Sequence, residues 1–230
     1  AALEEAGKPQ AGEIRDAIAR MAPTLRALRH ADGGLARFHG GGRGLDGRLD
    51  QALAASGVKR RKVDGLAMGF ARLAAGRTTV ILDAAPPPVG AASADAHAST
   101  LAMELTSGRR PMIVNCGAGH DFGEDWHRAG RASPSHSTLC IEGYSSARLA
   151  SARWVGQSQR ELLEDGPVSV PVEMRKTAEG YRVEAGHDSH VEGHGLTHAR
   201  SLELSLDGRQ LSGDDFLVAL DDSARAAFDR

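Results

Sequence analysis

The stretch GLAMGFARLAAGRTTVILDA at residues 65–84 decides the fold. Two apolar runs, MGFARL and TTVILD, flank the turn AAGR at residues 74–77. A helix followed by a strand would also fit these letters, but Gly69 would weaken a helix across the first run. The pattern therefore favours a β-hairpin.

Short strand-like runs continue beyond this hairpin. They are separated by glycine or proline turns, a pattern typical of an antiparallel sandwich or barrel. The predicted strands are STLAMELTS (99–107), RPMIVNCG (110–117), HSTLCIEG (136–143), VSVPVEMRK (168–176), GYRVEAGHD (180–188), ARSLELSLDG (199–208) and RQLSGDDFLVAL (209–220).

The part before residue 60 has a helical pattern. Apolar residues recur at three-and-four spacing from Ala11 to His30, and Pro23 should kink or split this helix near Ala22. A glycine-rich loop at residues 30–44 could bring backbone close to a ligand or a neighbouring domain. The run LDGRLDQALAAS then predicts a short helix that ends at Gly57.

These patterns predict a mainly β fold, with a helical segment at residues 1–60 and an antiparallel β-sandwich at residues 61–230. Two or three helices cannot readily enclose a core of their own. Either they pack on the sheets, or they are the end of a larger helical domain that is missing from this chain, and we expect the chain to be a fragment of a longer protein.

Composition excludes several classes of function. With 28 Lys+Arg against 30 Asp+Glu, the charge of −2 gives no reason to expect a nucleic-acid partner, and the run KRRK at residues 59–62 predicts a solvated loop. No apolar stretch approaches the length of a membrane span, and the first ten residues lack the pattern of a signal peptide. Two cysteines cannot form a disulfide framework or a four-thiolate zinc site.

Three polar residues stand at the ends of apolar runs: His97 in DAHAST, Asn115 in IVNCG and His136 in PSHSTLCIEG. Adjacent strands could bring them together, and histidine is a common zinc ligand. The alternative is that each histidine is a surface residue or a hydrogen-bonded core residue.

A second histidine group lies in GHDSHVEGHGLTH at residues 186–198. It could be a metal-binding tract or a polar, exposed loop. His198 directly precedes an alternating strand, so it is the histidine of this group that we expect to be held in place.

The stretch DAAPPPVGAASADAHASTLAMELTSGRRPMIVNCG at residues 83–117, together with PSHSTLCIEG, resembles the C-terminal sheet domain of the heparinase II/III-like polysaccharide lyases. The resemblance covers residues 25 to 220 or so. It implies stacked antiparallel sheets after the end of an α/α toroid, with an upstream helical toroid domain in the same protein. It also implies an acidic polysaccharide partner, such as a glycosaminoglycan, and a location in the cell envelope or periplasm.

The resemblance also implies roles for individual residues. His97 matches a histidine of the family's H-A-H loop, and Asp95 replaces the other histidine of that pair; both are expected at the catalytic site. His97, Asn115 and His136 match metal-binding positions, with zinc as the cofactor. His136 is expected to bind substrate, and so is His198 of the second histidine group, although the family motifs give no match for His198. The family's tyrosine has no match in Tyr144 or Tyr181.

The implied reaction is β-elimination at a uronic acid, which would make the protein a carbon–oxygen lyase. Asn115 removes one anionic ligand, and Asp95 would repel a uronate unless it is protonated or metal-bound. A non-catalytic carbohydrate-binding or structural sandwich module is therefore the alternative. A metal-dependent hydrolase is a third class, which would require stoichiometric metal.

Overall fold

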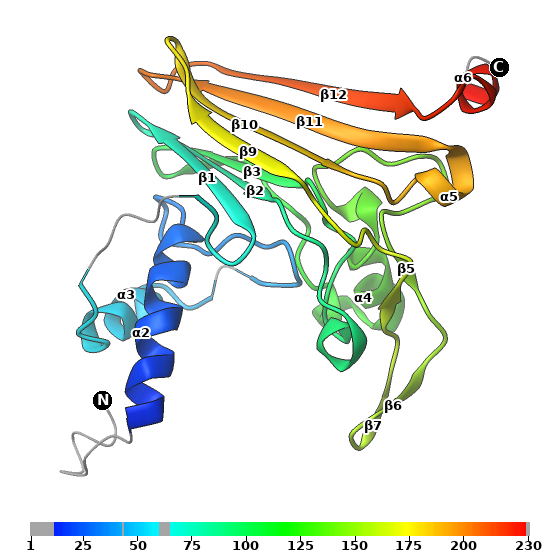
Figure 1. Ribbon diagram of the computed structural model, residues 1–230. Coiled ribbons are helices and arrows are strands. Elements are labelled where there is room, and N and C mark those ends of the chain that lie inside the picture. The colour runs from blue at the N-terminus through cyan, green and yellow to red at the C-terminus, as the bar shows by residue number, and fades with distance from the viewer. Residues whose placement is uncertain (1–11, 43, 60–64, 229–230) are drawn as a thin grey trace.

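The computed structural model describes residues 12–42, 44–59 and 65–228. Two helices, α2 (Gly12–Ala27) and α3 (Arg48–Ala55), precede a region dominated by strands (Figure 1). The strands are β1 (Phe70–Ala75), β2 (Thr78–Asp83), β3 (Met103–Ser107), β4 (Arg110–Ile113), β5 (Arg148–Leu149), β6 (Arg153–Val155), β7 (Ser158–Arg160), β8 (Leu163–Glu164), β9 (Val172–Lys176), β10 (Gly180–His187), β11 (Leu196–Ser205) and β12 (Leu211–Ala219). The later helices are α4 (Glu124–Gly130), α5 (Val191–His194) and α6 (Asp222–Phe228), with 3-10 turns η1 (Gly90–Ser93), η2 (His120–Phe122) and η3 (Ser133–Ser135).

Two four-stranded antiparallel sheets form the body of the protein. The strand order is β1-β2-β3-β4 in the first sheet and β12-β11-β10-β9 in the second. The predicted hairpin is confirmed, because β1 and β2 pair from Phe70↔Asp83 to Ala75↔Thr78. The mainly β, antiparallel fold class is confirmed as well.

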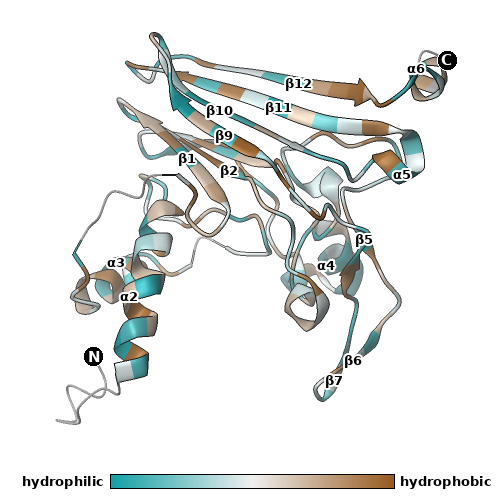
Figure 2. Cartoon of the chain, in the orientation of Figure 1, coloured by the Kyte–Doolittle hydropathy of each residue, from teal (hydrophilic) through white to brown (hydrophobic). Residues whose placement is uncertain are grey.

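The core lies between the two sheets. The residues of β11 from Leu196 to Ser205 are alternately buried and half-buried, and in its last four residues hydrophobic and hydrophilic side chains alternate in the same way (Figure 2). This two-residue period sends every second side chain toward the other sheet. The buried core residues are Ala71, Leu73, Val80, Leu82, Ala84, Leu101, Val183, Ala185, Leu202 and Leu204.

The first sheet is covered on its opposite face too. Ile81 points away from the sandwich core and packs with Phe38 of the glycine-rich loop and with Ala102. The Phe38 ring also stacks on Phe70, with ring centroids 5.3 Å apart. Burial on both faces explains why three consecutive apolar residues, Val80, Ile81 and Leu82, stand at the centre of β2.

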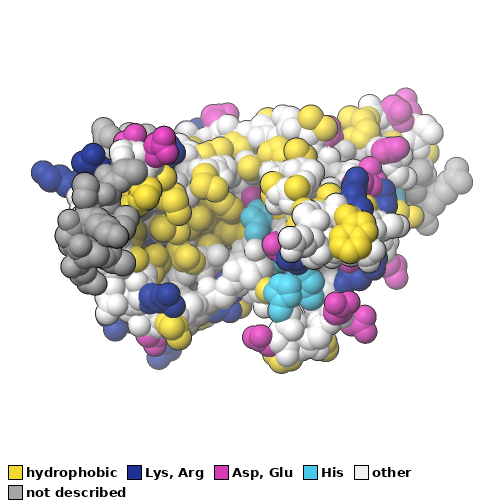
Figure 3. All heavy atoms as spheres, turned by 90° about the horizontal axis from the view of Figure 1, so that it is seen from below, with side chains coloured by type: hydrophobic (Ala, Val, Ile, Leu, Met, Phe, Trp, Pro, Cys, Tyr) yellow, Lys and Arg dark blue, Asp and Glu magenta, His cyan; other side chains and the backbone are white. Residues whose placement is uncertain are grey.

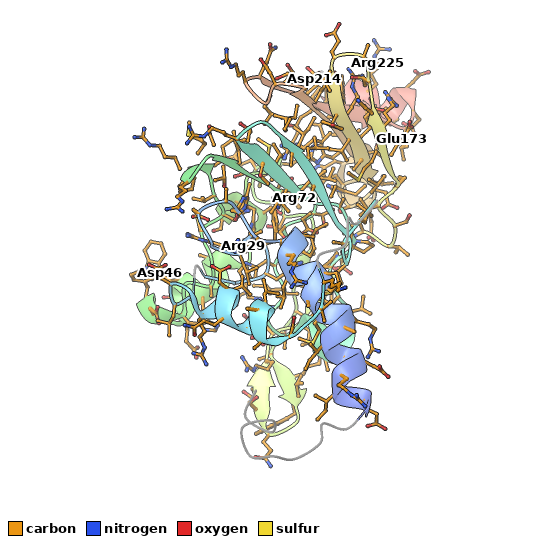
Figure 4. The ribbon with its side chains drawn as sticks, turned by 90° about the vertical axis from the view of Figure 1, so that its left-hand side faces the viewer. Arg29, Asp46, Arg72, Glu173, Asp214 and Arg225 are labelled. Atoms are coloured by element: carbon orange, nitrogen blue, oxygen red, sulfur yellow. The ribbon has the colours of Figure 1, made fainter. Side chains whose placement is uncertain are left out.

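An arginine connects the N-terminal helices to this sheet. Arg72 of β1 donates from Nη1 to the carbonyl oxygens of Ala27 (2.8 Å) and Arg29 (2.9 Å), just after α2 ends. Figure 4 shows Arg29 and Arg72 together at this junction. The C-terminal end of α2 is therefore anchored to the sheet.

Two predictions of local structure were wrong, namely a split of the first helix at Pro23 and a strand at residues 136–143. Helix α2 continues through Pro23 to Ala27 instead of splitting near Ala22. Proline removes one backbone donor, and the buried Ala22 shows that this turn still packs against the protein. Residues 136–143 form no strand in the described structure; the Ser137 carbonyl accepts from Met103 N–H at the start of β3 and from Arg200 Nη1 of β11, but no strand pairing extends from this contact.

None of the described helices is long and apolar enough to cross a membrane. The predicted basic loop falls largely on residues 60–64, which lie outside the described residues. The short helix before Gly57 is confirmed, and Gly57 has the positive φ of 63° expected after a helix end. The boundary predicted near residue 60 stays a prediction.

Candidate functional site

The first sheet brings together the three residues singled out at strand ends. Asn115 follows β4, and Glu104 lies in the neighbouring strand β3. His97 lies between η1 and β3, and His136 follows η3. Antiparallel pairing of β3 with β4 places Asn115 beside Glu104, and the two loops add the histidines.

The four side chains form a continuous hydrogen-bonded chain, which we call the Glu104 relay. Asn115 Nδ2 donates to Glu104 Oε1 at 3.1 Å, and Asn115 Oδ1 lies 3.1 Å from His136 Nδ1. His136 Nε2 then lies 3.1 Å from His97 Nδ1. Glu104, Asn115, His97 and His136 are all buried.

The relay determines where the ring protons lie. Asn115 Nδ2 faces a carboxylate, so its Oδ1 must face His136, where it accepts from Nδ1–H. His136 Nε2 is then an acceptor, and His97 Nδ1–H donates to it. This leaves His97 Nε2 with an unprotonated lone pair, and Nε2 is buried without a hydrogen-bond partner among the described residues.

Burial keeps these imidazoles neutral. It lowers the pKa of His97 to about 3, and the nearby imidazoles of His136 and His39 add to this because two protonated rings would repel each other; burial also lowers the pKa of His136 to about 4. Burial alone would raise the pKa of Glu104, but hydrogen bonds from His30, Arg37 N–H and Asn115 outweigh it and lower that pKa. The relay therefore links the carboxylate anion of Glu104 to the neutral imidazole of His97.

The glycine-rich loop covers the end of the relay. His97 N–H donates to His39 Nδ1 at 3.2 Å, so a neutral His39 carries its proton on Nε2, 3.6 Å from Asp83 Oδ2. Burial raises the pKa of Asp83 to about 7 and lowers that of His39 to about 4. The side chain of His39 is 29% exposed, which makes it the member of this group that solvent reaches most easily.

Gly40 closes over the free nitrogen of His97. Its φ is 74°, and a Cβ at this position would lie 2.9 Å from His97 Nε2. A side chain here would strain the backbone and press on the imidazole. On the face seen from below, hydrophobic side chains line a hollow, and histidines reach the surface near it (Figure 3).

The arrangement does not fit a metal ion shared by His97, Asn115 and His136. Asn115 Oδ1 faces Nδ1 of His136, while His97 faces Nε2 on the other side of the same ring. The three donors therefore do not converge on one point. Zinc predicted at these residues has no common coordination centre in this geometry.

Asp95 lies outside the relay. Its side chain is 66% exposed, and Oδ1 accepts from Arg160 Nη1 at 3.3 Å. Ligand atoms of Asp95, His120 and His127 lie within 4.8 Å of one another. A group that could hold a metal ion is thus present close to His97, though with different residues from those predicted.

His198 belongs to a separate buried cluster in the second sheet. Its Nδ1 lies 3.2 Å from His187 Nε2, and its Nε2 lies 2.7 Å from Asp215 Oδ1. Both ring nitrogens are occupied and the side chain is fully buried, so this geometry does not support the predicted contact with substrate. Of the second histidine group, His187, His190 and His198 are buried and do not form an exposed loop.

Sequence reasoning missed Glu104, His30, His39 and Asp83. Glu104 stands in MELTS, where alternation places it on the face opposite Met103 and Leu105. A carboxylate at an inward position of a strand buried on both faces is the signal that could have identified it. His30 completes its environment, with Nε2 at 2.9 Å from Glu104 Oε2 and Nδ1 at 2.8 Å from Thr106 Oγ1.

Comparisons with known proteins agree with this architecture. Residues 57–229 match the family described as Heparinase II/III-like, C-terminal. The chain is also 31% identical over 228 residues to the FtsZ-localized protein C of Caulobacter vibrioides, covering 97% of this chain and 38% of the relative. No solved structure matches. The chain therefore belongs to the heparinase II/III-like C-terminal family.

Proposed function

We propose that this chain is the sheet side of a polysaccharide lyase-like site that acts by β-elimination on a uronic-acid-containing acidic polysaccharide. The observation that carries the proposal is the unprotonated, unpaired Nε2 of His97 at the end of the Glu104 relay. A lone pair fixed by a chain of hydrogen bonds is what a general base requires.

In the proposed step, His97 Nε2 takes the proton from C5 of the uronate. The electrons of the C5–H bond form the C4=C5 double bond, and the C4–O bond breaks. The leaving oxygen takes a proton from an acid, which the family resemblance places on the helical toroid of the whole protein. His39 is the most exposed member of the group, and in this proposal its Nε2–H, now 3.6 Å from Asp83 Oδ2, donates to a sugar oxygen.

Substrate binding would strengthen the base. The pKa of His97 is about 3 in the closed protein, where burial disfavours its charged form. A uronate carboxylate nearby favours the charged form and raises that pKa toward the working pH. The glycine-rich loop must move to admit the sugar, and a segment with three consecutive glycines, Gly40 to Gly42, has little steric resistance to such a change.

The test uses the full-length protein and a panel of glycosaminoglycan and alginate-like polymers. The expected result is ultraviolet absorbance from unsaturated uronate, lost in His97→Gln and retained in the surface variant Asp125→Asn. Asn115→Ala should lower the rate and shift the ¹⁵N resonances of the His97 ring nitrogens, because the relay would no longer fix the tautomer. Absence of product from every polymer would contradict the proposal.

A second candidate is a non-catalytic, polysaccharide-binding role. It is favoured by the burial of His97, which is only 1% exposed beneath the glycine-rich loop. The name of the Caulobacter relative places that protein with FtsZ and mentions no reaction. Under this candidate, His97→Gln leaves polymer binding unchanged and no unsaturated product forms. Location in the cell envelope or periplasm and an acidic polysaccharide partner belong to both candidates.

A further inference from the structure

Three metal-ligating side chains converge at the surface beside the Glu104 relay. Asp95 follows η1, His120 begins η2 and His127 lies in α4. One ligand atom from each lies within 4.8 Å of the others. Two imidazoles and one carboxylate are a common set for zinc and related divalent ions, and they leave at least one coordination position open.

The backbone is shaped to hold the two histidines together. Gly119 has a φ of 70°, and a Cβ there would lie 2.4 Å from the carbonyl oxygen of Trp126. Only glycine allows η2 to approach α4 this closely. As a result, the rings of His120 and His127 stack with centroids 3.6 Å apart.

A backbone carbonyl fixes the tautomer of one ligand. His127 Nδ1 lies 3.0 Å from the carbonyl oxygen of Ala118, so Nδ1 carries the proton and donates it. Nε2 is then the unprotonated nitrogen that can bind a metal. A histidine oriented by a carbonyl at its other nitrogen is the usual outer-shell arrangement of metal ligands.

We propose that Asp95, His120 and His127 bind one divalent ion of the zinc class, and that its open position takes the carboxylate of a uronate. The second half of this inference rests on the proposed function. A divalent ion with one aspartate and two neutral imidazoles has a net charge of +1. The loaded site would then attract a uronate, whereas Asp95 without the ion would repel it.

Arg160 is the group that competes with the metal for Asp95. Its Nη1 lies 3.3 Å from Asp95 Oδ1. A carboxylate has two oxygens, so the metal and Arg160 can each have one. Both cations would then lie at Asp95, which precedes His97 by two residues in the chain.

Metal binding is tested on chelator-treated protein by calorimetric titration with Zn²⁺ and by the visible spectrum of bound Co²⁺. The expected result is one ion per chain with a dissociation constant of about 1 μM or below. Asp95→Asn and His120→Ala should each weaken binding by about 100-fold or more, since removal of an outer-shell group alone costs about 10–100-fold. Asp125→Asn and His194→Gln are matched controls that should bind as the unaltered protein does.

His127→Ala also removes the contact with Ala118, so its folding is checked by circular dichroism; His120, which is exposed, provides the cleaner variant. Failure of the unaltered protein to bind a stoichiometric ion overturns the metal site, as does equal binding in Asp95→Asn and His120→Ala. Glucuronate should change the spectrum of the Co²⁺-loaded protein, and an unchanged spectrum overturns the uronate role alone. Because metal binding is measured without turnover, a protein that binds Zn²⁺ but makes no unsaturated product contradicts only the lyase proposal.

Discussion

Replacement of Glu104 tests whether the relay is anchored as described. Glu104 is 2% exposed, and its Oε1 accepts from Arg37 N–H (2.9 Å), Asn115 N–H (3.2 Å) and Asn115 Nδ2 (3.1 Å). Glu104→Ala leaves two backbone N–H groups without this acceptor. Each costs about 1–3 kcal/mol, so the free energy of unfolding should fall by about 2–6 kcal/mol.

Glu104→Gln is the matched control, because it keeps an acceptor at the Oε1 position. Its amide nitrogen would face His30 Nε2, and His30 can accept there by moving its proton to Nδ1, next to Thr106 Oγ1. What is lost is mainly the extra strength of bonds to a charged acceptor, so we expect a smaller loss of about 1–2 kcal/mol.

The pH dependence gives an independent check. The pKa of Glu104 is lowered below its ordinary 4.5 in the folded protein. The unfolded chain therefore binds the proton first, and the contribution of Glu104 is present above pH 4.5 and is lost as the pH falls through the folded pKa. Glu104→Gln should lack this component.

Urea unfolding followed by circular dichroism measures both effects. A Glu104→Ala protein within about 1 kcal/mol of the unaltered protein would refute the view that Glu104 anchors the relay. Equal losses of unfolding free energy in the alanine and glutamine variants would contradict this explanation, because they would mean that the acceptor at Oε1 does not stabilise the protein.

Three further predictions concern the glycine-rich loop, the sandwich core and the stability of the protein at low pH. Gly40→Ala should cost about 1–2 kcal/mol in backbone strain plus a clash with His97, while Gly44→Ala, with φ 73° and open space, should show the strain alone; equal costs in urea unfolding would contradict the contact. Leu204→Ala, fully buried between the sheets, should lose about 2–5 kcal/mol of unfolding free energy, and a loss under about 1 would mean that the sandwich core is misplaced. Several histidines have folded pKa values far below 6.5, so the unfolded chain binds their protons first and stability should fall on acidification below pH 6.5; Asp83, with its pKa raised to about 7, opposes this. Four histidines less one aspartate give a slope of up to about 4 kcal/mol per pH unit, and equal stability at pH 7 and at pH 5 would contradict the burial of these rings. The histidines are His39, His97, His136 and His187.

The sequence predicted the sheets better than the site. Alternation in SLELSL and the turn at Gly76 depend on neighbouring residues, and both gave the observed strands. HSTLCIEG was also predicted as a strand, yet it forms none in the described structure, and its Ser137 carbonyl accepts from Met103 N–H and Arg200 Nη1, contacts that no local pattern reveals. His97, Asn115 and His136 were singled out by position and do meet, but the partner that orders them, Glu104, is separated from Asn115 by the β3–β4 turn and became visible only through strand pairing.

The second histidine group also shows that strand pairing, which the local sequence does not reveal, decides the contacts of a side chain. His198 was expected to be held in place, and it is, but by His187 across the β10–β11 pair and by Asp215 across the β11–β12 pair. A glycine-containing, histidine-rich sequence suggests exposure. Burial here follows from the length of β10 and β11, which carries His187 and His198 into register with each other.

The relay has a consequence for comparing members of this family. Glu104, Asn115 and His136 support one another inside the protein, so a change at one weakens folding whether or not a reaction takes place. Selection for expression alone would preserve them in descendants that have lost any enzymatic role. Family members that differ in function should instead differ at the positions of Asp95 and His120, because these residues are exposed and can vary with little effect on folding.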